Sequence, residues 1–158
     1  MRKVITLIAA GLVAAAISAG AAPAATHPFA ASYSGRVTEK VVDNSVTGTV
    51  AGKNTAGLAR STLAGIVKGS QANACSPLSG PGKIKSGTST IKLTIVTTKS
   101  RACAAGEDDR DHINVSGQVK VTGGTGKYAG ASGLLTIKGT YNRSNGLFSV
   151  KFSGSLKY

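Results

Sequence analysis

Apolar and polar residues alternate along most of this 158-residue chain, which is the pattern of strands with one buried face. Turn residues interrupt the alternation at short intervals. The last segment is the clearest, because every second position from Phe148 to Tyr158 is apolar or glycine and the positions between are Ser or Lys. Alternation and turn residues together predict eight strands, at 29–42, 45–52, 60–70, 82–87, 89–99, 112–122, 133–142 and 146–157.

A glycine sits in the middle of the apolar row in six of these segments. Glycine within a strand gives up packing area and marks a bend or a close backbone approach. Its repetition on successive strands indicates a sheet that coils into a barrel. The six positions are Gly35, Gly48, Gly65, Gly117, Gly139 and Gly154.

We therefore expect an all-β fold, an antiparallel closed barrel of about eight strands, with a two-sheet β-sandwich as the alternative. Lysines and threonines occupy the outer face of the predicted strands, whereas a membrane barrel needs apolar side chains there. A soluble barrel is favoured. Only the segment 54–60 is compatible with a short helical turn, and 143–146 is expected to form a hairpin turn with Gly146 at positive φ.

The N-terminal segment has the pattern of a bacterial secretory signal peptide. Arg2 and Lys3 precede an apolar run over 4–17, and Ala22-Pro23-Ala24 fits a cleavage site. We expect residues 1–24 to be the signal peptide and 25–158 to form a single domain, with a retained membrane anchor as the alternative. The mature protein would then be secreted or extracytoplasmic and associated with the cell surface.

The mature chain is strongly basic. Without Arg2 and Lys3, 17 of the 19 basic residues remain against six acidic ones, a net charge of +11. Such a charge favours anionic partners. Lys92, Lys120, Lys138 and Lys151 could form a stripe across neighbouring strands. Nucleic-acid binding is not expected, because the polar faces lack aromatic residues for base stacking.

Cys75 and Cys103 are the only two cysteines. In an exported protein the default expectation is a disulfide, which would tie the predicted loops 71–81 and 100–111 together. Closing this loop is worth about 3.5 kcal/mol in the chain-entropy picture. Free thiols are the alternative. A zinc site is disfavoured, because the cysteines and His27 and His112 lack the spacing of zinc ligands.

An acidic tract, 107–111, holds four of the six acidic residues. Clustered carboxylates on a loop suit Ca²⁺, although their spacing matches no known calcium motif. The alternative is a solvated loop that pairs with nearby lysines. Whether a metal binds is left open.

The sequence contains no convincing catalytic constellation and indicates no cofactor. His112 follows Asp111 directly, and adjacent strand residues point to opposite faces, so an exposed strand-end histidine is the better interpretation. Glu39 is in phase with Tyr33 and Val37 and could face the barrel interior near its mouth, unless the strand has ended or bulged by then.

The segment 123–133, GGTGKYAGASG, resembles the GGTG-x-[FY]-x-x-A-x-G motif of the allene oxide cyclase and dirigent proteins and their bacterial exported relatives. The resemblance extends over about 112–158. It implies an eight-stranded antiparallel barrel in which Tyr128 plugs one end, and a cavity that serves an isomerase or a ligand-guiding protein.

These observations lead to two functional hypotheses. The first is a secreted, non-enzymatic protein whose basic surface associates with anionic envelope polymers. The second is an isomerase of the allene oxide cyclase and dirigent type, or a binder of a small apolar ligand, that uses the barrel cavity. Candidate ligand-binding residues are Tyr33, Glu39, Tyr128 and Tyr141. A third possibility is a scaffold whose loop 100–111 contacts a protein partner.

Overall fold

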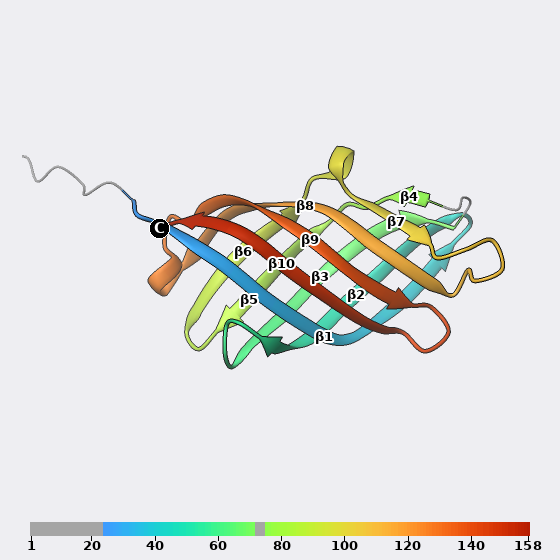
Figure 1. Cartoon of the computed structure of the whole chain (residues 1–158), viewed down its shortest axis with the longest axis horizontal. Helices are drawn as coiled ribbons and strands as arrows, with labels where there is room; N and C mark the ends of the chain where they lie inside the picture. The colour runs from blue at the N-terminus through green and yellow to red at the C-terminus, as the bar shows by residue number, and fades with distance from the viewer. Residues whose placement is uncertain (1–23, 72–74) are drawn as a thin grey trace, which may run out of the picture.

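The computed structural model describes residues 24–71 and 75–158 (Figure 1). Except for Ala24, the predicted signal peptide lies outside the described residues. Eight antiparallel strands close into a barrel in the order β8-β6-β5-β3-β2-β1-β10-β9, and β9 pairs back onto β8. The barrel strands are β1 (Thr26–Val42), β2 (Ser45–Ala56), β3 (Ser61–Ser70), β5 (Pro81–Ser86), β6 (Ser89–Ile95), β8 (His112–Thr125), β9 (Ser132–Asn142) and β10 (Leu147–Lys157).

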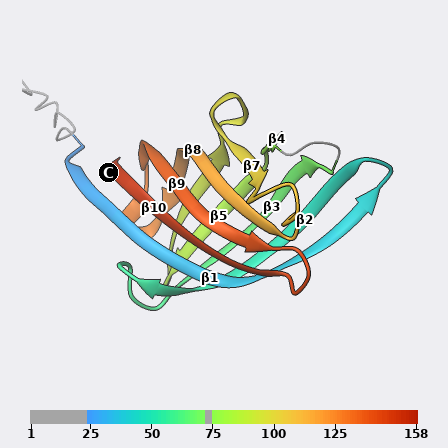
Figure 2. The same cartoon turned by 45° about the vertical axis from the view of Figure 1, so that its right-hand side comes forward.

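The predicted closed barrel is thus confirmed, and the sandwich alternative is excluded. All eight predicted strands are present, with ends that differ by a few residues. Figure 2 shows the strands wrapping around one axis, with the β1–β2 hairpin extending beyond its neighbours. No helix in the described part of the chain is long and apolar enough to cross a membrane.

Close backbone approach explains most of the recurring glycines, all six of which lie within barrel strands. At four of them, a Cβ atom would lie under 3.0 Å from a carbonyl oxygen of the neighbouring strand: Gly35, Gly65, Gly139 and Gly154. A Cβ at Gly48 would instead meet the side chains of Val37 and Val67 inside the barrel, at 2.6 and 3.0 Å. The absent side chains therefore allow tight coiling of the sheet.

The predicted loops 71–81 and 100–111 contain two short strands that lie outside the eight-stranded barrel. These are β4 (Cys75–Pro77) and β7 (Arg101–Ala104), which pair with each other, and β7 also pairs with the first half of β8. Cys75 and Cys103 are directly opposite in this pair and form the predicted disulfide. The bridge holds β4 and β7 at one end of the barrel.

The predicted strand 89–99 is wrong beyond Ile95. There the chain leaves β8 and forms a 3₁₀ turn, η1 (Thr97–Lys99), before β7 resumes the pairing. The buried Ser100 anchors this detour: its Oγ donates to the carbonyl of Gln118 at 3.0 Å and accepts from the Gln118 N–H at 3.1 Å. Gly117 is required here because a Cβ would overlap Ser100.

No helical turn forms within 54–60, the one segment whose sequence is compatible with one. Instead, β2 continues to Ala56. The pairing of β1 and β2 shifts register between Ser32 and Tyr33, and the Asn54 side-chain amide donates hydrogen bonds to the carbonyls of Ser32 and Ala56 at this point. The 3₁₀ turns are instead η1 and η2 (Gly126–Tyr128). The hairpin turn at 143–146 forms as predicted, with Gly146 at φ 71°.

The two ends of the barrel differ. At the end that holds the connections 57–60, 87–88 and 126–131, here called the closed end, large side chains fill the axis. Tyr128 is 3% exposed and packs edge-on against Tyr158, with ring centroids 5.1 Å apart. The opposite end, here called the open end, holds the connections 43–44, 105–111 and 143–146.

Candidate functional site

A cavity of about 170 Å³ occupies the barrel axis toward the open end. All eight barrel strands contribute to its wall, which is mostly aliphatic and aromatic. The inner-row glycines Gly48, Gly65 and Gly82 also line it, and the missing side chains leave the axis unfilled. Apolar lining residues include Val37, Val50, Leu93, Val115, Ile137 and Val150.

Polar groups are concentrated at the mouth of the cavity. Glu39 on β1, Tyr141 on β9 and Arg143 just after β9 all line it and are half-buried. The backbone N–H of Arg143 donates to the carbonyl of Asp111 at 2.8 Å, which fixes this residue beside the 105–111 loop. Arg143 Nε is buried and has no hydrogen-bond partner within the described ranges. The mouth thus offers a carboxylate, a phenol and a guanidinium around an apolar chamber.

Tyr141 stays protonated in this environment. Its burial raises the pKa of the hydroxyl most, and the nearby carboxylate of Glu39 raises it further, while the positive charge of Arg143 partly opposes these effects. The Tyr141 O–H is therefore a hydrogen-bond donor across the physiological pH range.

The structure separates the four candidate ligand-binding residues into two pairs. Glu39 and Tyr141 lie together at the mouth, because β1 continues to Val42 without ending or bulging at Glu39. Tyr33 and Tyr128 are buried toward the closed end and do not line the cavity. Tyr33 contacts Phe152, which does line it, with ring centroids 5.9 Å apart. These two tyrosines belong to the packed core.

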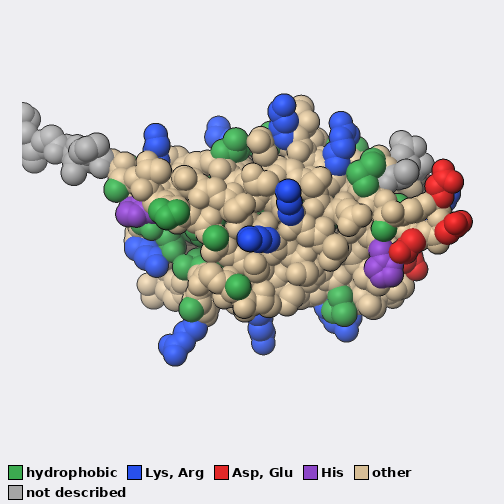
Figure 3. Space-filling view, viewed as in Figure 1, with side chains coloured by type: hydrophobic (Ala, Val, Ile, Leu, Met, Phe, Trp, Pro, Cys, Tyr) green, Lys and Arg blue, Asp and Glu red, His purple; other side chains and the backbone are tan. Residues whose placement is uncertain are grey.

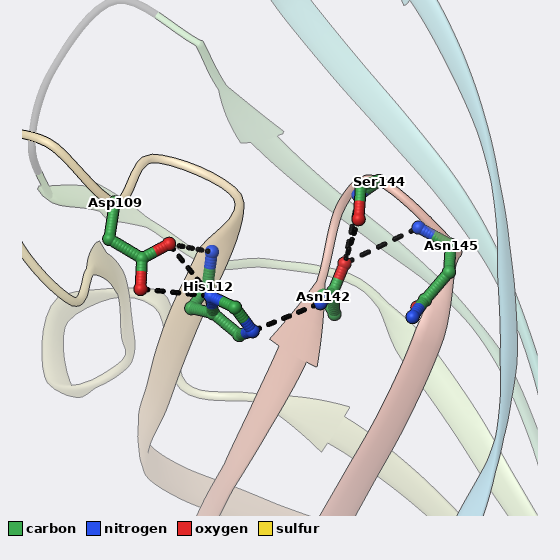
Figure 4. Close-up of polar contacts among 5 residues, drawn as sticks. All are labelled: Asp109, His112, Asn142, Ser144 and Asn145. Carbon is green, nitrogen blue, oxygen red and sulfur yellow. Dashed lines mark hydrogen bonds and ion pairs between the residues drawn. The ribbon is translucent and has the colours of Figure 1, made fainter.

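A polar network lies beside the mouth (Figure 4). His112 Nδ1 lies 2.7 and 2.8 Å from the two carboxylate oxygens of Asp109, and His112 Nε2 lies 3.1 Å from the side-chain nitrogen of Asn142. The Asn142 oxygen accepts from the backbone N–H groups of Ser144 and Asn145 and from the Ser144 hydroxyl. These three bonds fix the amide orientation, so its nitrogen donates to Nε2 and the Nδ1–H donates to Asp109.

This network corrects the interpretation of the acidic tract. His112 is an exposed residue at the start of a strand, as expected, but its partner is Asp109 rather than the adjacent Asp111. The expected pairing of the tract with lysines is wrong, because no Lys or Arg in the described residues lies within 4.0 Å of a carboxylate. Within 24–71 and 75–158 there is also no group of three His, Cys, Asp or Glu residues that could hold a metal ion.

Sequence reasoning missed Arg143 at the mouth and Asn142 in the network. Both depend on the β8–β9 pairing, which places Asn142 directly opposite His112. The alternation of each strand gives its inner face but not its register against a neighbour. The only available signal was that Asn142 directly precedes the predicted turn at 143–146 and Arg143 begins it, at the same end of the barrel as His112.

No known family profile, curated protein sequence or solved structure matches the chain. The cavity and its mouth are therefore interpreted from their own geometry.

Proposed function

We propose that this protein binds a small apolar molecule in the cavity at the open end of the barrel. The observation that carries this proposal is the unfilled apolar axis, about 170 Å³ in volume. Apolar cavities of about 150 Å³ in other proteins hold benzene or xenon. A molecule with one six-membered ring therefore matches the available space, and a polar substituent would reach Glu39, Tyr141 or Arg143 at the mouth.

Binding of benzene tests this proposal, with methyl NMR shifts as the readout. We expect benzene to shift the methyl signals of Val37, Val50 and Ile137, which line the cavity. The variant Gly82→Val fills part of the cavity and should weaken binding at least tenfold. A Cβ at Gly82 has only ordinary contacts, 3.5 Å to the Ala64 carbonyl oxygen and 3.8 Å to Leu93, so the fold should tolerate it.

Gly106→Val is the matched control, because it adds the same atoms in open space on the 105–111 loop. It should bind benzene as the wild type does. Equal loss in both variants, or wild-type shifts spread over the outer surface, would contradict a site within the barrel.

A relationship to the allene oxide cyclase and dirigent proteins is part of this proposal. The motif resemblance at 123–133 and the eight-stranded closed barrel support it. In that case the cavity would serve an isomerase or guide a ligand. Incubation with an allene oxide, followed by chiral chromatography, separates these roles from simple binding: an enriched enantiomer indicates catalysis, and a racemic product indicates a binding protein.

The charge distribution favours a second candidate function, association of an exported, non-enzymatic protein with anionic polymers of the bacterial envelope. All six acidic residues lie at the open end, in or next to the β1–β2 and β7–β8 connections (Figure 3). Basic residues cover the rest of the barrel, and the disulfide is compatible with an oxidising compartment. Retention on an anionic matrix should fall steeply as salt rises, and salt-independent retention would contradict it.

A further inference from the structure

Five neighbouring barrel strands each carry at least one exposed lysine on their outer face. These strands, β5, β6, β8, β9 and β10, are consecutive around the barrel. Because strands lie about 4.8 Å apart, the five strands cover about 20 Å measured across the strands. We call one lysine from each strand, taken together, the lysine band: Lys83, Lys92, Lys120, Lys138 and Lys151.

The strand register places two pairs of these charges directly opposite each other and offsets Lys120 along the strands from both pairs. Lys83 is directly opposite Lys92, and Lys138 is directly opposite Lys151. Lys120 is opposite Thr94, two positions along β6 from Lys92, and Lys138 is opposite Ser116, four positions along β8 from Lys120. The band therefore runs diagonally across the five strands. Like charges directly opposite each other on neighbouring strands destabilise a sheet. Two such pairs lower the stability of the fold. The lysine band is therefore better explained by a role other than stabilising the fold.

Nothing in the described residues neutralises the band. The acidic residues are confined to the open end, and no lysine or arginine there or elsewhere in the described ranges forms an ion pair with a carboxylate. Figure 3 shows Lys and Arg side chains along the flanks and the Asp and Glu side chains gathered at the far end from the C-terminus. The band therefore presents an unscreened positive potential to solvent.

We propose that the lysine band binds a linear envelope polymer whose repeating units are joined by phosphodiesters, such as poly(glycerol phosphate). This inference rests on the second candidate function and assigns it to one surface. A free anion would contact only one or two of these side chains, whereas a chain can run across all five strands. Lysine binds phosphate as a point charge without a fixed fork geometry, which suits a flexible chain.

The same surface lacks the features of a nucleic-acid site. Binding of single strands uses exposed aromatic side chains on which bases stack. None of the three Phe and four Tyr side chains of this protein is exposed. A polymer without bases does not depend on stacking, so the lack of exposed aromatic side chains does not weaken its binding. The envelope polymer is therefore favoured over single-stranded DNA.

The test compares two variants with equal loss of charge. One replaces the five band lysines by Gln, and the control replaces five exposed lysines elsewhere, Lys40, Lys53, Lys68, Lys99 and Lys157, by Gln. Affinity for fluorescent poly(glycerol phosphate) is measured by anisotropy between 50 and 200 mM NaCl. If all five contacts form, the wild-type affinity should fall about a hundredfold over this range, at a slope of about 0.7 per contact.

We expect the band variant to lose most of the affinity and the salt dependence, while the control keeps most of both. The band variant should unfold at the same or a higher temperature than the wild type, since it loses two repulsive pairs, so lost binding cannot be attributed to lost folding. Monomeric glycerol phosphate at equal total phosphate should compete poorly.

Each of the other possible outcomes contradicts one part of the proposal. Equal loss in both variants overturns the band and leaves general electrostatic association, the second candidate function, intact. Absence of wild-type binding overturns both. Single-stranded DNA of equal phosphate number binding more tightly than poly(glycerol phosphate) overturns the envelope polymer as the partner, and equal competition by the monomer overturns recognition of a chain.

Discussion

The Tyr33 hydroxyl lies 2.9 Å from Ser61 Oγ inside the barrel, and both residues are almost completely buried. The Ser61 hydroxyl donates to the carbonyl of Leu58, so Tyr33 donates to Ser61. The pair links β1 to the start of β3, which are not neighbours in the sheet. A polar bond therefore crosses the barrel interior close to the closed end.

Ser61→Ala should destabilise the protein by about 1–3 kcal/mol, because it leaves the buried Tyr33 donor without its acceptor. Tyr33→Phe removes that donor, so the double variant should cost less than the sum of the two single variants. Urea unfolding of the four proteins measures this coupling. Strict additivity would show that the two hydroxyls do not interact.

The tight contact at Gly35 makes a second prediction about stability. A Cβ at Gly35 would overlap the carbonyl of Ala51 on β2, so Gly35→Ala should cost about 1–3 kcal/mol of folding free energy. Gly106→Ala is the control, since its Cβ would meet nothing within 4 Å, and it should change stability by less than about 0.5 kcal/mol. Similar effects at both sites would argue against the role of glycine in coiling the sheet.

Much of this fold could be predicted from alternation alone. Residues on the inner face of a strand can be identified in the sequence because every second residue of a strand is buried and apolar. The glycines in that inner row indicated the curvature of the sheet correctly. The detour at η1 could not be predicted, because it depends on Ser100 bonding to Gln118, a contact between segments 18 residues apart. Local patterning contains no information about that contact.

The site could be predicted only where the alternation of inward and outward side chains along a strand places a residue in it. Glu39 shares the inner face with Val37, and its place at the mouth follows from that once the strand is known to continue. The same reasoning suggested Tyr33, and the motif resemblance suggested Tyr128, yet neither lines the cavity. The alternation shows that a side chain points inward but not how far along the barrel axis it lies. The filled and unfilled halves of the barrel differ only in their position along this axis.

Tyr141 should titrate abnormally. Its folded pKa is raised above the ordinary value of 10.0, so the protonated phenol contributes fully to stability below pH 10 and this contribution is lost as the pH rises above that value. Glu39→Gln should lower the pKa of Tyr141 relative to the wild type but leave it raised, because burial is the larger cause. Ultraviolet difference titration against Tyr141→Phe isolates this tyrosine, and an ordinary pKa there would contradict the geometry of the mouth.

Asp109 should titrate in the opposite direction. The hydrogen bond from His112 lowers the pKa of the Asp109 carboxyl below its ordinary value of 3.8. A carboxyl with a lowered folded pKa stabilises the folded loop above its unfolded pKa, and this stabilisation is lost as the pH falls through the folded value. The bond between Asp109 and His112 should therefore persist to about pH 4 and break only in stronger acid.

Carboxyl ¹³C NMR between pH 2 and 6 follows this carboxyl directly. His112→Ala should return the pKa of Asp109 to its ordinary value of 3.8, because the donor is gone. Asn142→Ala is the matched control: it removes the bond to His112 Nε2 but leaves Nδ1 beside Asp109, so the pKa of Asp109 should stay low. If both variants shift the pKa equally, Asn142 is needed to hold the imidazole, and if neither does, the His112 bond is not the cause of the low value.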